Sequence, residues 1–182
     1  YACALIATGR FKAGLAAVQF AQQMLRATHD AEGGDEDEDY KAEMTVMQVQ
    51  HAFAVHKLGD AAAALEDYAA LLAPSSGATP AVRAVATNNQ LCAGTITGDA
   101  AANGLKRLEA AMAQAGDKLS TQQRSILNLN CAALLAWTKR GKEARELLET
   151  VVREDSANVS PVDVAYVRVF SYLREKAFPE AT

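Results

Sequence analysis

A spacing of small and large side chains recurs three times along this chain of 182 residues and constrains its fold more than any other feature. A small residue is followed twelve positions later by another small residue, and then, after four and three more positions, by two apolar residues. The three sets are Ala52, Ala64, Tyr68 and Leu71; Ala132, Ala144, Leu148 and Val151; and Ala2, Gly14, Val18 and Ala21. Two antiparallel helices approach closely only where small residues face each other, so the spacing predicts helical hairpins that stack on one another.

Turn and cap signals divide the chain into five predicted hairpins. They cover residues 1–28, 41–73, 79–115, 120–154 and 160–182, the last with an incomplete second helix. Ser120 and the pair Ser160 and Pro161 are typical helix starts, and Gly9 and Gly59 stand at turns, each seven residues after a small residue. The period of roughly 34 residues is that of tetratricopeptide (TPR) repeats. We therefore expect an all-α, TPR-like α-solenoid of four to five hairpins, a single array over residues 1–182 with an irregular third hairpin.

The segment of residues 29–40 interrupts this pattern. It contains five consecutive acids, two adjacent glycines and no aliphatic residue larger than alanine. Like-charge repulsion and the glycines predict a solvated acidic loop inserted between the first two hairpins. The formal charge of −4 is concentrated in this segment, and the other residues carry a net +3. The charge therefore implies neither a polyanion binder nor a generally acidic protein.

The chain offers no apolar run close to the ~20 residues that cross a bilayer, so we expect no membrane segment. It opens without Met, basic region or cleavage site, and Tyr1 already lies in a helical pattern, so we interpret it as a piece of a longer protein. Cys3, Cys92 and Cys131 are an odd number of cysteines in apolar surroundings. They predict buried free thiols and a reducing compartment, the cytosol or nucleus.

Residues that would indicate an enzyme form no recognisable pattern. His51 and His56 are five positions apart, which places them on different faces of a helix and is wrong for a pair of metal ligands. The chain has no glycine-rich phosphate loop and no nucleophile motif, so we expect no catalytic residue, metal, cofactor or small-molecule ligand. The basic residues between Lys139 and Arg145 could contact phosphates, but pairing with the glutamates of the same helix is the favoured interpretation.

Several segments resemble one family of TPR proteins. The segments are YACALIATGRFKAGLAAVQFAQQM before the acidic insertion, LGDAAAALEDYAALLAP after it, then AVRAVATNNQ, KLSTQQRSILNLNCAALLAW and SPVDVAYVRVFSYLREKAF. In this order they are similar to the N-terminal repeats of the 72-kDa subunit of signal recognition particle, over nearly the whole chain. Asn88, Asn89 and the block from Lys118 to Asn130 are the more specific parts of the resemblance. The high alanine content and the region 94–116 match it less well.

The resemblance implies an interaction scaffold of a protein-targeting ribonucleoprotein. The concave groove of the repeats would hold a segment from the C-terminal region of the 68-kDa subunit, forming a heterodimer. That heterodimer would support co-translational targeting to the endoplasmic reticulum from the cytoplasm, and a nucleolar assembly stage stays open. The basic RNA-contacting segment of the family follows the repeats, so we expect this fragment to contact the particle's RNA only weakly or indirectly. The alternative is a TPR co-chaperone or another TPR adaptor that binds a peptide of an unrelated partner.

The candidates for partner binding lie on the first helices of the hairpins, because these helices line the groove of a stacked array. Tyr166, Phe170 and Arg174 follow one another at four-residue spacing and form one stripe, and interface hot spots favour aromatics with arginine. Packing in the core is the alternative for Phe53, Trp137 and the aromatic stripe, and an inter-helix hydrogen bond is favoured for Asn130. The candidates are Val49, Phe53, His56, Asn88, Trp137, Tyr166, Phe170 and Arg174.

Overall fold

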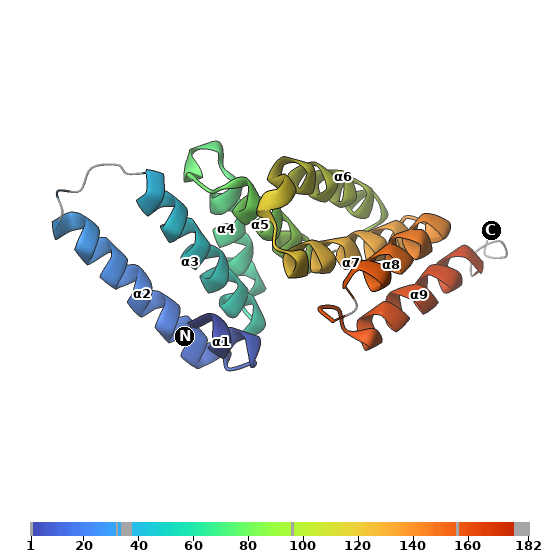
Figure 1. Cartoon of the computed structure of the whole chain (residues 1–182), viewed down its shortest axis with the longest axis horizontal. Helices are drawn as coiled ribbons and strands as arrows, with labels where there is room; N and C mark the ends of the chain where they lie inside the picture. Colours follow the sequence, from blue (N-terminus) through green and yellow to red (C-terminus); the bar gives the residue numbers. More distant parts are fainter. Residues whose placement is uncertain (1, 32, 34–37, 96, 156, 177–182) are drawn as a thin grey trace. The chain divides into compact units, whose positions relative to one another are not determined.

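The computed structural model describes residues 2–31, 33, 38–95, 97–155 and 157–176. The regular structure within these ranges is entirely helical, which confirms the all-α prediction for them (Figure 1). Two of the elements are short 3₁₀ helices, η1 and η2. In chain order the helices are α1 (Ala2–Ala7), α2 (Phe11–Ala31), α3 (Glu38–Lys57), α4 (Ala61–Leu72), η1 (Pro74–Ser76), α5 (Pro80–Ala93), α6 (Gly98–Ala115), η2 (Gly116–Lys118), α7 (Thr121–Trp137), α8 (Gly141–Asp155) and α9 (Pro161–Lys176).

Contacts between the helices divide the chain into two compact units. Unit 1 is Tyr1–Thr95 and contains α1 to α5, and unit 2 is Ile96–Thr182 and contains α6 to α9. The boundary falls between α5 and α6, so the predicted third hairpin, 79–115, is divided between the units.

In unit 1 each helix packs against the next one along the chain, and α2, α3 and α4 lie side by side (Figure 1). The predicted crossing residues Ala52 and Ala64 are fully buried, with Tyr68 and Leu71 buried beside them. Val49, Val82 and Ala86 complete this core cluster. Alanine at the α3/α4 crossing leaves room for the larger side chains of the neighbouring turns.

Unit 2 repeats this arrangement with α7 and α8, and α9 packs against both of them. Ala132, Ala144 and Leu148 are fully buried, and Val151 is almost so. The backbones of α8 and α9 approach closely at Gly141, where an added Cβ would lie 2.8 Å from the carbonyl oxygen of Ser171. The small-residue spacing thus marks a buried helix crossing in both units.

Three turns contain the same pair of hydrogen bonds and lie at the same sequence offset from the repeated small residues. The turn residues Gly9, Gly59 and Lys139 each lie seven positions after Ala2, Ala52 and Ala132, and all three have a positive φ. In each turn the N–H of this residue donates to the carbonyl of the residue three positions earlier, and the N–H of the next residue donates to the carbonyl five positions before it. This is the Schellman closure of a helix. At Lys139 the left-handed conformation, φ 63°, is held by a residue with a side chain.

Side chains at the predicted helix starts accept hydrogen bonds from the first turns. Ser120 caps α7 in a capping box with Gln123: the Ser120 Oγ accepts from the Gln123 N–H at 3.1 Å, and the Gln123 Oε1 accepts from the Ser120 N–H at 2.9 Å. At the start of α9 the Ser160 Oγ accepts the N–H of Asp163 at 3.4 Å. These caps satisfy N–H groups that have no partner within the helix.

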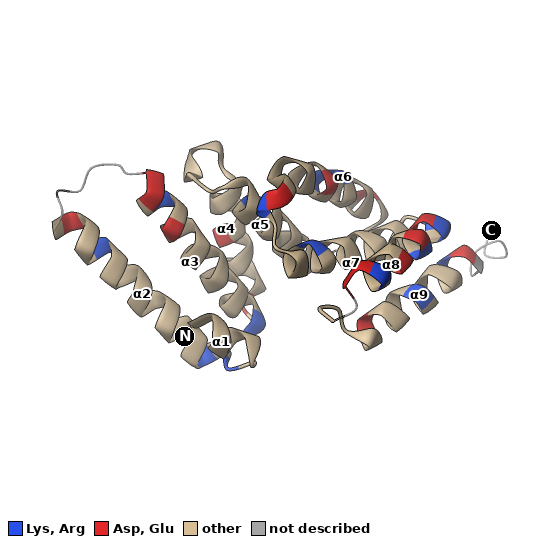
Figure 2. Ribbon diagram, in the orientation of Figure 1, with Lys and Arg blue, Asp and Glu red and all other residues tan. Residues whose placement is uncertain are grey.

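The helices on either side of the acidic segment extend into the predicted loop of residues 29–40. Residues 29–31 belong to α2 and residues 38–40 belong to α3, while residues 32 and 34–37 lie outside the described residues. The rings of His29 and Tyr40 stack with centroids 3.9 Å apart and join the two helix ends. Glu38 and Asp39 form the first turn of α3, where the helix dipole favours negative charge (Figure 2). The loop prediction was therefore wrong at both ends. It considered only the repulsion between neighbouring acids and not the favourable position of Glu38 and Asp39 at a helix start.

The prediction of three buried thiols was also wrong. Cys131 is buried, but Cys3 and Cys92 are exposed. Cys3 lies on the short helix α1, where its Sγ is 3.3 Å from the Oε1 of Gln50. The apolar neighbours of a cysteine in sequence do not decide which face of a helix carries it.

Candidate functional site

In unit 2 a cavity of about 580 Å³ lies between α7 and α9. Its walls contain Ile126, Asn130 and Ala133 from α7, and Asp163 and Tyr166 from α9. The cavity also reaches three members of the hydrophobic core cluster of this unit, namely Leu129 on α7, Val159 before α9 and Val167 on α9. It is therefore an apolar depression over a packed core, with a few polar groups at its rim.

Beyond the cavity the same two helices carry a stack of aromatic rings. Tyr166 and Phe170 stack with centroids 6.2 Å apart, and Phe170 stacks on Trp137 at 5.4 Å. The guanidinium carbon of Arg174 lies 5.0 Å from the centroid of the Trp137 ring. Tyr166 belongs to both the cavity and the stack. We therefore treat them as one surface, the α7/α9 groove, formed by the cavity together with Trp137, Phe170 and Arg174.

A buried hydrogen-bond network holds the connection that forms one rim of this groove. The carboxylate of Asp155 accepts hydrogen bonds of 2.6 Å from the Oγ of Ser125 and from the Nδ2 of Asn158, which lines the cavity. Asp155 itself is buried. Charge-assisted hydrogen bonds of this length are strong, so they hold Asn158 at the end of α8 and tie that end to α7. The sequence carries no motif that would have identified these three residues.

Next to the groove, α9 exposes a stripe of large apolar side chains. The exposed fractions are 75% for Val162, 70% for Tyr166, 57% for Val169 and 58% for Leu173. The opposite side of the same helix is buried, for example at Val164. A helix that is apolar on two faces is one that is usually covered on both, and contiguous exposed apolar residues are typical of interaction sites.

The structure brings four of the predicted partner-binding residues together in this groove, namely Trp137, Tyr166, Phe170 and Arg174. The other four lie in unit 1. Val49 is a member of the unit 1 core cluster, and Asn88 is buried and donates its Nδ2 to the Oδ1 of Asn89 at 3.1 Å.

Phe53 and His56 are half-buried on α3. The ring of Phe53 meets the ring of Phe11 edge to face at 6.3 Å, and the Nζ of Lys57 lies 5.3 Å from its centroid. Phe53 thus packs against α2 and keeps part of its surface accessible.

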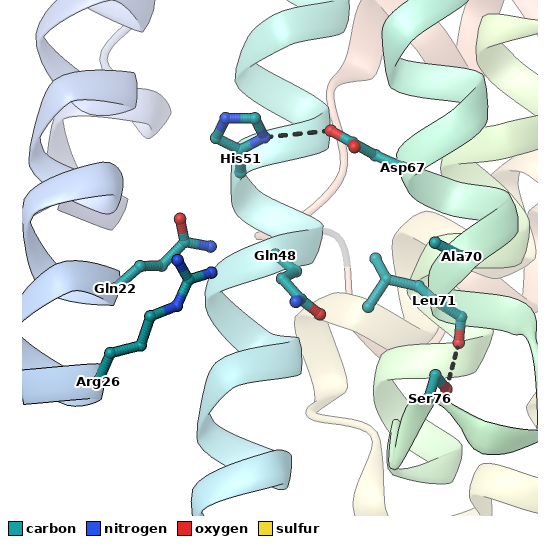
Figure 3. Close-up of a pocket in the computed structure, with 8 residues that line it drawn as sticks. All are labelled: Gln22, Arg26, Gln48, His51, Asp67, Ala70, Leu71 and Ser76. Atoms are coloured by element: carbon teal, nitrogen blue, oxygen red, sulfur yellow. Dashed lines mark hydrogen bonds and ion pairs between the residues drawn. The ribbon is translucent and has the colours of Figure 1, made fainter. Parts of the chain in front are cut away.

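Unit 1 contains a second, more polar pocket of about 350 Å³ over α2, α3 and α4 (Figure 3). Its lining residues are Gln22, Arg26, Gln48, His51, Asp67, Ala70, Leu71 and Ser76. The Nδ1 of His51 lies 3.1 Å from the Oδ2 of Asp67, and the Ser76 hydroxyl donates to the carbonyl of Leu71 at 2.8 Å. Sequence reasoning missed this pocket because its polar residues come from different helices and form no motif.

The described residues contain no group of His, Cys, Asp and Glu side chains that could hold a metal ion. Within the same ranges no helix combines the length and the apolar composition needed to span a membrane. The pKa of the Cys131 thiol is raised to about 12 by burial, which keeps it protonated and unreactive at neutral pH.

These features define an all-helical chain with an apolar inter-helix groove in one unit and a polar pocket in the other. Comparisons of the chain with protein-family models, with curated proteins and with solved structures find no match.

Proposed function

We propose that this chain is a protein-interaction module and that its α7/α9 groove binds a segment of a partner protein. The observation that carries the proposal is the stack of Tyr166, Phe170 and Trp137 beside the groove cavity. Aromatic rings with an adjacent arginine are enriched among the residues that dominate binding energy at protein interfaces. The exposed stripe on α9 would extend the apolar surface that a partner covers.

The basic residues around α8 are paired with glutamates, and this pairing favours a protein partner over RNA. Arg140 donates to Glu143 at 2.7 Å, and Arg145 donates to Glu175 at 2.8 Å. Lys142 lies 3.8 Å from Glu146, so the density of positive charge is largely compensated on this surface (Figure 2). Binding to RNA depends on uncompensated Lys and Arg that replace counterions along the phosphates. We therefore propose that this chain binds RNA only weakly or indirectly.

The partner that the sequence resemblance implies is the C-terminal region of the 68-kDa subunit of signal recognition particle. The chain would then be a scaffold of that particle, acting in the cytoplasm and at the endoplasmic reticulum. A TPR-like α-solenoid is the corresponding finer proposal for the fold. The recurrent small-residue crossings and the three Schellman turns at one offset support it.

A TPR co-chaperone that captures the terminal carboxylate of a heat-shock protein is less well supported. Such capture needs Lys, Arg and Asn side chains that converge on one carboxylate. The cavity of the α7/α9 groove instead has an acidic residue, Asp163, beside Asn130 and apolar side chains. The one arginine of the groove, Arg174, donates its Nη2 to the carbonyl of Trp137 at 3.0 Å.

A binding experiment with matched variants tests the proposal. Overlapping peptides from the C-terminal region of the 68-kDa subunit are titrated into the 182-residue chain, with the fluorescence of its single tryptophan, Trp137, as the signal. We expect Tyr166→Ala to weaken binding at least tenfold, or about 1.4 kcal/mol. Tyr172→Ala is the control, because Tyr172 is also exposed on α9 but stacks on Arg145 of α8, with the guanidinium carbon 4.3 Å from its ring.

Affinity for such a peptide should depend little on salt, because the groove is largely apolar. A parallel titration with the particle's RNA should give weak binding that falls steeply as salt rises. Tight RNA binding without affinity for any of the peptides would reject both the groove assignment and the proposed partner.

A further inference from the structure

Three polar side chains from two helices line the polar pocket of unit 1, Gln22 and Arg26 from α2 and Gln48 from α3. Gln22 and Arg26 are one turn apart on α2, and Figure 3 shows both heads directed towards α3, where Gln48 lies. No hydrogen bond or ion pair joins these three side chains to other described residues. Arg26 is exposed and Gln48 is half-buried. Their N–H groups are therefore available to a ligand that occupies the pocket.

These groups define the chemistry of the ligand. A guanidinium presents a planar fork of N–H donors that matches the two oxygens of a carboxylate or two oxygens of a phosphate. The amide of glutamine adds N–H donors and a carbonyl acceptor. Together the guanidinium and the amides can bind an oxyanion at the α2 side of the pocket, and an amide carbonyl can accept a hydrogen bond from an N–H group beside it.

The opposite side of the pocket selects between a carboxylate and a phosphate. Asp67 lies on the α4 side, paired with His51, and its side chain is 41% exposed. Asp30, one turn beyond Arg26 on α2, is exposed as well. The positive charge of Arg26 is therefore already opposed by the carboxylates of Asp67 at the pocket and Asp30 near it. A dianionic phosphate would face this negative charge, whereas a monoanionic carboxylate needs only one guanidinium.

We propose that the pocket formed by α2, α3 and α4 is a second peptide-binding site, which takes an acidic side chain of a bound protein segment. The carboxylate of the Asp or Glu pairs with Arg26, and the amides of Gln22 and Gln48 bond the same carboxylate or the adjacent peptide group. Ala70 and Leu71 supply the apolar part of the lining. The volume of about 350 Å³ is at the small end of ligand sites and suits one side chain with its flanking backbone. This site is separate from the α7/α9 groove and does not depend on the function proposed for it.

Nuclear magnetic resonance titrations of the whole chain test this site. The probes are a short capped peptide with a single Glu between alanines, the same peptide with Gln in place of Glu, and inorganic phosphate at equal ionic strength. We expect saturable shifts for the Glu peptide at the side-chain amides of Gln22 and Gln48 and at the Nε of Arg26. The Gln peptide and phosphate should each bind at least tenfold more weakly.

The matched variants are Arg26→Gln and Arg168→Gln, which remove the same charge from exposed positions on α2 and α9. Arg26→Gln should weaken the Glu peptide at least tenfold, and Arg168→Gln should leave its affinity unchanged. Equal binding of the Glu and Gln peptides, or equal effects of the two variants, would overturn the proposal. Tighter binding of phosphate than of the Glu peptide would also overturn it, in favour of an inorganic oxyanion site.

Discussion

Arg174 on α9 makes two contacts with Trp137 at the end of α7. Its Nη2 donates a hydrogen bond of 3.0 Å to the backbone carbonyl of Trp137, and its guanidinium carbon lies 5.0 Å from the centroid of the same residue's ring. The carbonyl belongs to the last turn of a helix, where it has no partner within the helix. One side chain thus completes the end of α7 and orders the ring that closes the α7/α9 groove.

Replacing this arginine should loosen the groove. We expect Arg174→Gln to lower the free energy of unfolding by about 1–3 kcal/mol, because both the charged hydrogen bond and the cation–π contact are lost. Denaturant unfolding measures the change, and the fluorescence of the single tryptophan reports the local environment. Arg168→Gln serves as the control. If both variants unfold like the original chain with unaltered fluorescence, the contacts between Arg174 and Trp137 do not form in solution.

Gly141 should be irreplaceable for the packing of α8 on α9. A Cβ there would lie 2.6 Å from the Oε1 of Glu175 and 2.8 Å from the carbonyl oxygen of buried Ser171, and the latter belongs to the backbone and cannot turn away. We expect Gly141→Ala to cost about 1–3 kcal/mol of stability. At Gly98, which begins α6, an added Cβ meets nothing within 4 Å. Gly98→Ala should therefore be neutral or stabilising by up to about 1 kcal/mol, and thermal unfolding of both variants checks the contrast.

Lys139 carries backbone strain that glycine would relieve. It has φ 63° at the turn position that Gly9 and Gly59 occupy elsewhere in the chain. The left-handed conformation costs a residue with a side chain roughly 1–2 kcal/mol, part of which is offset by the greater unfolded-state freedom of glycine. We expect Lys139→Gly to raise the free energy of unfolding by about 0.5–1 kcal/mol. A lower melting temperature for this variant would mean that the Lys139 side chain stabilises the turn by more than the strain.

The crossing of α3 and α4 should reject larger side chains. Ala64 is fully buried in the unit 1 core, whereas Ala62 is exposed on the same helix. We expect Ala64→Leu to cost about 1–3 kcal/mol through overpacking and Ala62→Leu to change stability little. Differential scanning calorimetry of the two variants makes the comparison. Equal melting temperatures would show that the register of the two helices is wrong.

The cysteines should divide by reactivity. Because burial raises the pKa of Cys131 to about 12, its thiol stays protonated at pH 8, and the thiolate is the species that reacts. Cys3 and Cys92 are exposed. Desolvation also raises the pKa of the Cys92 thiol, which slows its reaction. Mass spectrometry after treatment of the folded chain with iodoacetamide should find Cys3 alkylated, Cys92 alkylated more slowly and Cys131 unmodified, with all three alkylated after unfolding. Rapid modification of Cys131 in the folded chain would contradict its burial.

What the sequence determined by itself is the helical character of the described residues, the capped starts of α7 and α9, and the small-residue crossings of α3 with α4 and of α7 with α8. The cap at Ser120 and the turns at Gly9 and Gly59 are local signals, since they depend on backbone groups only a few residues away. The spacing of Ala52 and Ala64 is similarly a local property of one hairpin, and both residues are buried as predicted. These features could be inferred because each is decided within one or two neighbouring helices.

Only the tertiary structure decided which distant side chains meet. The sequence indicated the aromatic stripe of Tyr166 and Phe170 on one helix, but the approach of α7 to α9 brought Trp137 against it. The pocket around Arg26 and the burial of Val49 likewise depend on how helix faces fit one another. Such fits arise from close packing of side chains that are far apart in sequence, and no local pattern encodes them. The stacking of His29 on Tyr40 likewise joins residues from two helices, α2 and α3.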